Sequence, residues 1–452
     1  MSKLRAFTSL LLIFTLIFLA ACGAKEEANG DDPAPNADPG TETEDVSQVE
    51  PEEKVDLNGA TIRIAQWWDG APTGGSELGD LSVEKHKQVE EKYNVKIEYV
   101  NVPWGEVVEK MTSTALSGEP FADIVQLEFR WVPALINGGY LKALEDIVDI
   151  NREEELPQSV KNMKFNGKIY GFSDSFNDTG GMFYNKTLFK REGLADPYEL
   201  QQKGEWTWSA FLEAAQKLTK DTNGDGTPDQ YGLSGDASLL AVYFVNSNDA
   251  SIIDESMGKV TIDSPNSLEA MQFVYDIYHT YKVIKPNEGD GWGDPRRYFT
   301  EGLVGMTQGW NWEGPDRVAN MSDDWGYVFW PKGPKATDYV VPISQSGFRF
   351  IPAGAKYPKE SYQIWKELQL WDHVEEGFVE YNESAFPGED AVDTAMQMRF
   401  KHKLDNYMGF GLDGDAWWAL HGMIESGSEP PATAIEKSMP ELQAAMDAIL
   451  KK

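Results

Sequence analysis

The sequence of 452 residues predicts an α/β fold with two lobes. Strand-like and helix-like segments alternate between residues 59 and 128, and such alternation builds a layered sheet through right-handed crossovers. The segment ADIVQLE, residues 122–128, is nearly continuously apolar, as are strands buried on both faces of a parallel sheet. The roughly 395 residues from Leu57 onward are enough for two domains or lobes.

The first elements follow from hydrophobic periodicity. A strand is expected at residues 59–68, a helix at 82–93 and a second strand at 95–102. A second helix then presents one apolar face, formed by Val107, Val108, Met111 and Ala115. Gly118 stops this helix before the apolar strand begins.

Later helices are expected from their capping residues. Thr207 is a predicted N-cap, and Ser264 caps a helix that has Pro265 in its first turn. Ser438 and Glu441 have the spacing of a capping box, which predicts the start of the last helix there.

The N-terminus predicts export and lipid attachment. A short basic start precedes an almost wholly apolar run, and residues 1–21 are expected to be a signal peptide. Leu19, Ala20, Ala21 and Cys22 resemble a bacterial lipobox, which implies acylation of Cys22, with palmitate among the expected modifications. An ordinary signal peptide or an uncleaved anchor is the alternative.

The next segment, residues 22–56, is expected to be a disordered acidic tether. Residues 23–56 contain twelve acids, two lysines and no aromatic residue, so they cannot bury enough apolar surface to fold. Cys22 is the single cysteine, so disulfides within the chain and thiolate metal sites are excluded. The net charge of −34 argues against nucleic acid as a partner and against docking on anionic lipid.

Four stretches, in order, resemble the extracellular solute-binding proteins of sugar ABC importers, the family that includes maltodextrin receptors. They are FADIVQLE (121–128), NGKIYGFSDSFNDTGGMFYNKTLFKREGL (166–194), WTWSAFLEAAQKLTKDTNGDGTPDQYGL (206–233) and FTEGLVGMTQGWNWEGP (299–315). The last departs from the family at its ligand-facing turn.

The resemblance implies a two-lobed clamp of the type II periplasmic-binding-protein class. Each lobe would be a mainly parallel sheet flanked by helices, and a multi-strand hinge would join the lobes. The expected first lobe comprises residues 57–178 and 306–345, and the second 179–305 and 346–452.

Aromatic and acidic residues that follow strand ends are the candidate ligand site. Sugars offer apolar C–H faces to aromatic rings and hydroxyl groups to polar side chains, and strand ends open onto binding clefts. The candidates are Trp67, Trp68, Glu128, Trp131, Asp178, Trp292, Trp310, Trp312 and Glu313. Glu128 and Asp178 could instead cap a helix or bind a lysine. Core positions are expected for Trp325, Trp330, Trp365 and Trp371.

The segment DTNGDGTPD has the spacing of the first half of a calcium loop. Its candidate metal ligands are Asp221, Asn223, Asp225, Thr227 and Asp229. The bidentate glutamate of a complete loop is missing, and a solvated turn is the alternative. A structural calcium ion is expected, and no other cofactor.

These observations predict a monomeric receptor, lipid-anchored on the extracytoplasmic face of the cell membrane. It would bind a sugar or oligosaccharide, close around it and dock on the transmembrane subunits of an ABC permease. No catalysis is expected. Alternatives are a secreted glycoside hydrolase, which would need two carboxylates flanking one bond, and a polysaccharide-binding surface lipoprotein.

Overall fold

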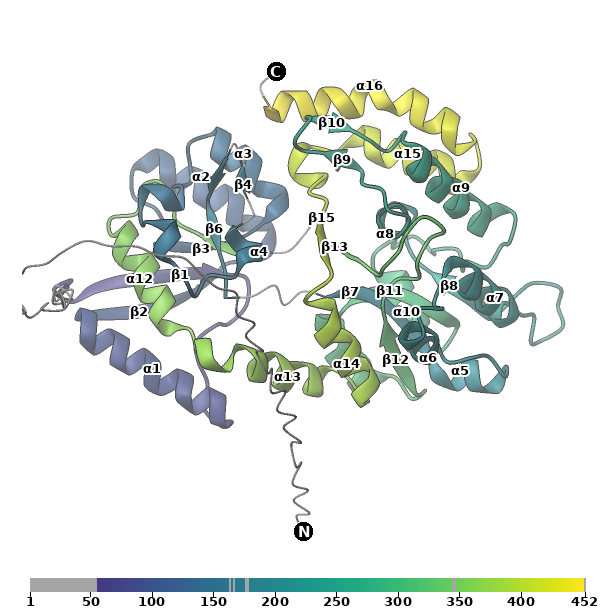
Figure 1. The fold of residues 1–452 in the computed structure, drawn as a ribbon, viewed down its shortest axis with the longest axis horizontal. Coiled ribbons are helices and arrows are strands. Elements are labelled where there is room, and N and C mark those ends of the chain that lie inside the picture. The colour runs from purple at the N-terminus through teal and green to yellow at the C-terminus, as the bar shows by residue number, and fades with distance from the viewer. Residues whose placement is uncertain (1–54, 162–163, 166, 175–178, 344–346, 451–452) are drawn as a thin grey trace, which may run out of the picture. The chain divides into compact units, whose positions relative to one another are not determined.

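The computed structural model describes residues 55–161, 164–165, 167–174, 179–343 and 347–450, all within one compact unit. The signal peptide, Cys22, nearly all of the tether and Asp178 lie outside the described residues. Two sheets, each flanked by helices, organise the described part of the chain (Figure 1).

The first sheet has the order β2-β1-β3-β14-β6. Its strands are β1 (Ala60–Gln66), β2 (Val95–Asn101), β3 (Ile124–Glu128), β6 (Gly171–Phe172) and β14 (Gly347–Phe350). β2, β1 and β3 are parallel, as the alternating pattern predicts, whereas β14 is antiparallel to β3 and to β6.

Helices cover both faces of this sheet, whose central strand β3 is buried on both sides. The two cores contain Val89 and Trp365 on one face and Met111 and Leu135 on the other. The helices concerned are α1 (Glu77–Tyr93), α2 (Val107–Ser117), α3 (Val132–Asn137) and α12 (Pro358–Leu368). Gly118 ends α2 with φ 78°, as expected for a C-cap.

The second sheet has the order β12-β7-β11-β8. Its strands are β7 (Gly180–Asn185), β8 (Tyr231–Ser234), β11 (Val304–Trp310) and β12 (Trp325–Val328). β8 pairs with β11 in parallel, and β7 is antiparallel to both β11 and β12, so β8, β11 and β12 run in one direction and β7 alone is reversed. This sheet is therefore mainly parallel in strand direction, as expected, with β7 as its one reversed strand.

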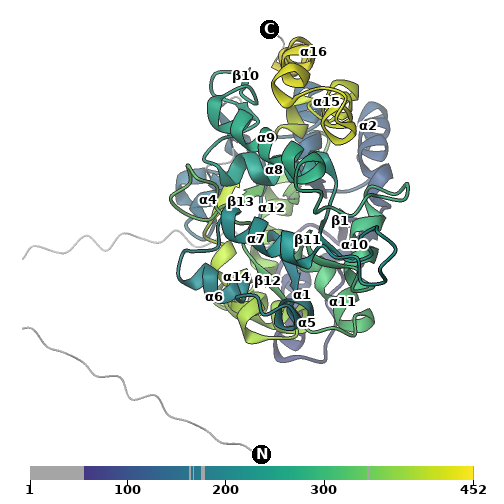
Figure 2. The same ribbon diagram turned by 90° about the vertical axis from the view of Figure 1, so that its right-hand side faces the viewer.

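One large core fills the second lobe, with helices around it (Figure 2). These are α5 (Lys186–Arg191), α6 (Pro197–Gln202), α7 (Trp208–Leu218), α8 (Ala237–Ser247), α9 (Pro265–His279), α10 (Gly293–Thr300), α11 (Gly314–Asn320), α13 (Val374–Ala385), α14 (Glu389–Met398), α15 (Asp415–Ser426) and α16 (Pro431–Leu450). Thr207 and Ser264 cap α7 and α9 as predicted.

The remaining strands form small two-stranded sheets. They are β4 (Lys164–Phe165) with β5 (Lys168–Ile169), β9 (Ile253–Asp254) with β10 (Lys259–Val260), and β13 (Val341–Ile343) with β15 (His402–Leu404). One short helix, α4 (Gln158–Lys161), precedes β4. Short 3₁₀ turns are η1 (Trp104–Glu106), η2 (Phe129–Trp131), η3 (Leu144–Asp146), η4 (Ile150–Arg152), η5 (Asn311–Glu313), η6 (Trp371–His373) and η7 (Met408–Phe410).

The predicted start of the last helix at Ser438 is wrong. α16 runs without interruption through Ser438, which is buried, and through Pro440. Ala434, Ile435, Leu442 and Met446 are buried along the whole helix, and this continuous apolar face outweighs the local cost of an interior proline.

The strand pairing also divides the chain differently from the expected lobe boundaries. Most of β11 and all of β12 lie in the predicted first-lobe segment 306–345, yet they pair in the second sheet with β7. β14 and α12 were expected in the second lobe, yet β14 pairs with β3 and α12 packs on α1. The chain therefore passes between the lobes after β6, after β13 and after α12.

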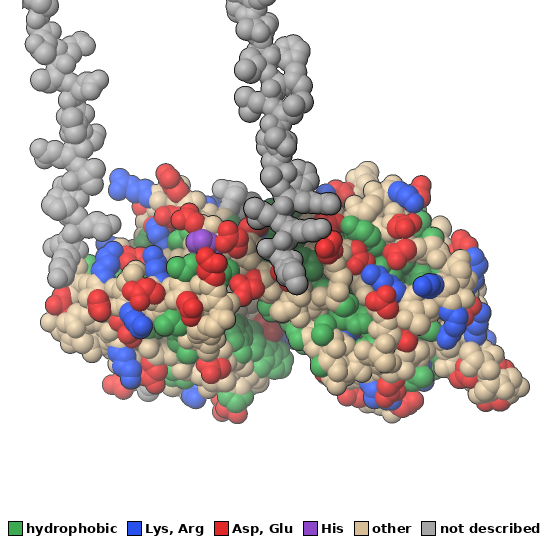
Figure 3. Space-filling model, turned by 90° about the horizontal axis from the view of Figure 1, so that it is seen from below, with side chains coloured by type: hydrophobic (Ala, Val, Ile, Leu, Met, Phe, Trp, Pro, Cys, Tyr) green, Lys and Arg blue, Asp and Glu red, His purple; other side chains and the backbone are tan. Residues whose placement is uncertain are grey.

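Acidic side chains are spread over the described surface and interspersed with lysine and arginine on the face shown in Figure 3. Within the described residues, no helix combines the length and apolarity needed to cross a membrane.

Candidate functional site

A row of four indoles lies at the carboxyl edge of the first sheet. Trp67 and Trp68 follow β1, Trp104 follows β2 in η1, and Trp131 follows β3 in η2. Their ring centroids are 5.3 Å apart for Trp68 and Trp67, 6.1 Å for Trp67 and Trp131, and 5.4 Å for Trp131 and Trp104. The carboxyl ends of parallel strands meet at one edge, so residues distant in sequence form one surface.

Glu128 and Arg130 hold this first row in place. Glu128 Oε1 accepts a hydrogen bond of 2.7 Å from the Trp104 indole Nε1, and Glu128 Oε2 is 2.7 Å from Arg130 Nε. The Arg130 guanidinium lies 5.6 Å from the Trp104 ring centroid. The carboxylate predicted to bind ligand therefore orients an indole and an arginine that line the row.

A second row, of three indoles, lies in the other lobe. Trp310 ends β11, Trp312 belongs to η5, and Trp292 immediately precedes α10. Trp310 and Trp312 are nearly parallel, at 11° with centroids 6.0 Å apart, and Trp292 is 5.7 Å from Trp310. The row borders the carboxyl end of β11, one strand of the parallel pair.

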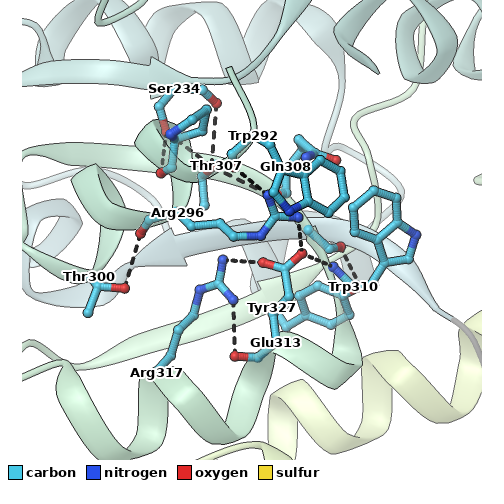
Figure 4. A network of polar contacts seen from close by, with 12 residues as sticks. Ser234, Trp292, Arg296, Thr300, Thr307, Gln308, Trp310, Glu313, Arg317 and Tyr327 are labelled. Atoms are coloured by element: carbon cyan, nitrogen blue, oxygen red, sulfur yellow. Dashed lines mark hydrogen bonds and ion pairs between the residues drawn. The ribbon is translucent and has the colours of Figure 1, made fainter. Parts of the chain in front are cut away.

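Arg296 and Glu313 meet beside these indoles (Figure 4). Arg296 Nη2 is 2.9 Å from Glu313 Oε1, and its guanidinium carbon lies 3.7 Å from the Trp292 ring centroid. Glu313 Oε1 also accepts from the Trp310 backbone N–H at 3.2 Å, and Oε2 is 2.7 Å from Arg317 Nη2. Glu313 is 4% exposed, so its carboxylate supports the second row from beneath.

The outer indoles of both rows are open to solvent. Trp68, Trp104, Trp292 and Trp312 are 43–49% exposed. These exposed indoles leave large apolar faces in contact with water. Clusters of exposed apolar side chains are typical of interaction sites. Trp325, Trp330 and Trp365, by contrast, lie in the core as predicted, and Trp371 packs at its margin.

The structure brings most of the predicted site residues into the two rows, and it adds two residues. The first is Trp104, which follows a predicted strand and which the strand-end rule would have identified. The second is Arg296, which lies one helical turn after Trp292. Its contact with Glu313 joins residues 17 positions apart, and no local pattern signals that contact.

The Asp-rich loop has its carboxylates turned onto its own backbone. Asp221 accepts from the N–H groups of Gly224, Asp225 and Gly226, and Asp229 accepts from Thr222. These bonds hold the pKa values of Asp221 and Asp229 below their usual range. Among the described residues, no three His, Cys, Asp or Glu side chains are grouped for a metal ion in this conformation.

The chain is similar to known curated proteins over part of its length. The arabinooligosaccharide-binding protein of Bacillus subtilis (strain 168) is 24% identical over 214 residues, 46% of each chain. The protein of the same name from Halalkalibacterium halodurans is 22% identical over 255 residues, 55% of this chain and 53% of that one. The chain thus spans about half the length of the curated relatives it matches.

Solved structures share the fold over most of the chain. An ABC substrate-binding protein of Listeria monocytogenes in complex with cycloalternan has a TM-score of 0.66 at 18% identity, covering 86% of this chain and 99% of that one. The GacH receptor of Streptomyces glaucescens has a TM-score of 0.62 at 20% identity, covering 87% and 99%. The fold is therefore that of two-lobed solute-binding proteins. The model of the family described as bacterial extracellular solute-binding protein matches residues 79–369, more than half of the sequence, and the chain belongs to that family.

Proposed function

We propose that this protein is the carbohydrate receptor of a bacterial ABC importer. The observation that carries the proposal is the pair of indole rows, each at the carboxyl end of parallel strands and each held by a glutamate–arginine pair. Aromatic faces match the apolar faces of sugar rings, and arginine N–H groups can donate to hydroxyl oxygens at the rim.

The dimensions of the rows favour an oligosaccharide over a monosaccharide. Consecutive ring centroids in the second row are 5.7 and 6.0 Å apart, so the row extends beyond one sugar ring. The names of the relatives support this class, since two are arabinooligosaccharide-binding proteins and one solved neighbour holds cycloalternan.

The receptor would act by lobe closure and delivery. The chain passes between the two sheets at separate points, which suits hinge motion around a bound solute. The closed, monomeric receptor would dock on permease subunits at the extracytoplasmic face of the membrane. It would break no bond, and nucleic acid is not among its partners.

Replacing Trp310 with alanine tests the site. We expect binding of oligosaccharide to weaken by tenfold or more, because a stacked aromatic anchor is lost. Intrinsic fluorescence titration with arabino-oligosaccharides, maltotetraose and cycloalternan measures the affinity. The control is Phe400→Ala, an aromatic residue that is 80% exposed and outside both rows. Equal titrations for Trp310→Ala and wild type would contradict the proposed site.

The same samples discriminate the hydrolase alternative. A receptor leaves each oligosaccharide intact after prolonged incubation, and an assay for reducing ends stays at its baseline. Release of reducing ends by the purified protein would establish catalysis instead.

Lipid attachment at Cys22 is tested by replacing Cys22 with serine. Because acyl chains on that thiol would provide the membrane anchor, we expect the variant to leave the membrane fraction and to retain wild-type sugar affinity. Fractionation of cells followed by titration measures both. Membrane retention of the variant after signal removal would contradict the anchor.

We also propose that the loop from Asp221 to Asp229 binds calcium weakly in a structural role. Its oxygen-rich side chains support the proposal, although binding requires rotation of the carboxylates away from the loop amides. Millimolar calcium should raise the melting temperature of wild type and not of Asp225→Asn combined with Asp221→Asn. An equal rise in both proteins would place the effect elsewhere.

A further inference from the structure

We propose that Arg296 is the positioning residue of the second indole row: it joins Trp292, Trp310 and Trp312 into one binding surface and links that surface to the core of the lobe. This inference rests on the proposed carbohydrate-binding function of the row, and it assigns to Arg296 a role that sequence patterns do not indicate.

Arg296 lies among all three indoles. Its guanidinium carbon is 3.7 Å from the ring centroid of Trp292, 5.9 Å from that of Trp310 and 5.8 Å from that of Trp312. It also donates a hydrogen bond to the backbone carbonyl of Trp292. A planar cation against an aromatic face is held both by electrostatic attraction and by stacking, so the contact restrains the Trp292 ring.

One carboxylate connects Arg296 to the rest of the row. Glu313 Oε1 accepts from both Arg296 Nη2 and the backbone N–H of Trp310, at 2.9 and 3.2 Å (Figure 4). The position of the guanidinium and the position of the residue that ends β11 are thus set by the same oxygen atom.

The other oxygen leads into the core. Glu313 Oε2 accepts from Arg317 Nη2 at 2.7 Å, and the Arg317 guanidinium lies 3.8 Å from the ring centroid of Phe183 in β7. Arg317 and Phe183 are 2% and 0% exposed, so this end of the network is rigidly packed. The network therefore runs from a core strand to three indoles at the surface, and Arg296 is its outermost charged member.

Removing Arg296 should leave the lobe folded. Arg296→Met keeps an aliphatic side chain of similar length, and Glu313 retains its buried partner Arg317, so no unpaired charge is created. What is lost is the cation that orders the indoles. A preorganised surface binds more tightly than one that must be ordered on binding.

The neighbouring arginine provides a matched control. Arg297 lies on the same helix and pairs with Glu288, Asp294 and Glu301, but its guanidinium lies against Tyr298 instead of the indoles. Arg297→Met removes the same charge without touching the row.

The experiment measures oligosaccharide affinity, melting temperature and ligand-free near-ultraviolet circular dichroism for both variants. For Arg296→Met we expect affinity to fall about tenfold, as for loss of a partly buried cation–π contact, together with an altered indole dichroism before sugar is added. Arg297→Met should keep the wild-type affinity and the wild-type indole dichroism. Matching affinities and spectra for the two variants would overturn the proposal.

A double-mutant cycle separates positioning from direct ligand contact. If Arg296 acts through the indole that it restrains, its replacement should cost much less affinity in a Trp292→Ala background than in wild type. Additive losses would overturn the positioning role.

If Arg296→Met fails to fold, Arg296→Lys replaces it as the test, because lysine keeps the charge but lacks the planar guanidinium. Wild-type affinity and wild-type dichroism in Arg296→Lys would overturn the positioning role equally. If wild type binds none of the sugars, the proposed function fails, while the ligand-free dichroism still tests whether Arg296 orders the indoles.

Discussion

Replacing Glu313 with glutamine is expected to lower the free energy of unfolding by about 3–5 kcal/mol, the cost of breaking a buried ion pair from one side. Glu313 is 4% exposed, and it is the shared partner of Arg296 and Arg317. Burial lowers the pKa of Arg317, but an arginine side chain remains protonated in proteins, so the variant would bury an uncompensated charge. Urea denaturation at neutral pH measures the change.

A surface carboxylate on the same region provides the control. Glu288 lies 2.9 Å from Arg297 Nη2, but its side chain is 60% exposed. Solvent screens that pair, so Glu288→Gln should change the unfolding free energy by less than about 1 kcal/mol. If the Glu313 and Glu288 variants are equally stable, Glu313 does not carry the burial cost assigned to it.

A second large effect is expected from Asp405, and it depends on pH. The Asp405 carboxylate is 2% exposed and accepts hydrogen bonds from the Ile252 N–H at 2.8 Å and from Asn246 Nδ2 at 2.9 Å. Burial raises the pKa of Asp405 to about 6, although these hydrogen bonds and nearby Lys403 favour its charged form. Glu255 lies close by, and burial together with the charge of Asp405 raises the pKa of Glu255 to about 7.

The sign of the pH effect follows from proton binding. The folded protein binds the Asp405 proton more tightly than the unfolded chain, whose carboxyl has a pKa near 3.8. The contribution of the protonated Asp405 carboxyl to the free energy of unfolding is therefore complete below about pH 4, and it is lost as the pH rises through 6. Asp405→Asn stays neutral and can still accept both hydrogen bonds. Relative to wild type, the variant should gain about 2–3 kcal/mol between pH 4 and pH 8.

Chemical denaturation of both proteins at the two pH values tests this expectation. Asp254→Asn is the control, since Asp254 is only partly buried and a hydrogen bond from Ser256 lowers its pKa. That variant should show no gain at high pH. If Asp405→Asn and wild type differ in stability by the same amount at pH 4 and pH 8, ionisation of Asp405 does not lower the free energy of unfolding.

Local patterns in the sequence identified much of the architecture. β1, β2 and β3 lie close to their predicted positions because alternation and apolar runs report which faces of a strand are buried. The caps at Thr207 and Ser264 were predictable because a capping bond joins residues three positions apart. The same local rule failed at Ser438, where the packing of α16 along the core outweighed it.

Long-range pairing was beyond those patterns. β14 returns to β3 across more than 200 residues, and no local periodicity shows which sheet a strand will join. This is why the expected lobe boundaries near residues 306 and 346 differ from the observed sheets.

The candidate site divides in the same way. The sequence by itself determined the chemistry, since indoles and carboxylates placed after strand ends predict an aromatic ligand site. Only the tertiary structure decided the roles: Glu128 orients Trp104, and Glu313 is buried between Arg296 and Arg317. The physical reason is that a charged side chain takes its role from the partner that compensates it in the folded protein, and that partner can lie anywhere in the chain.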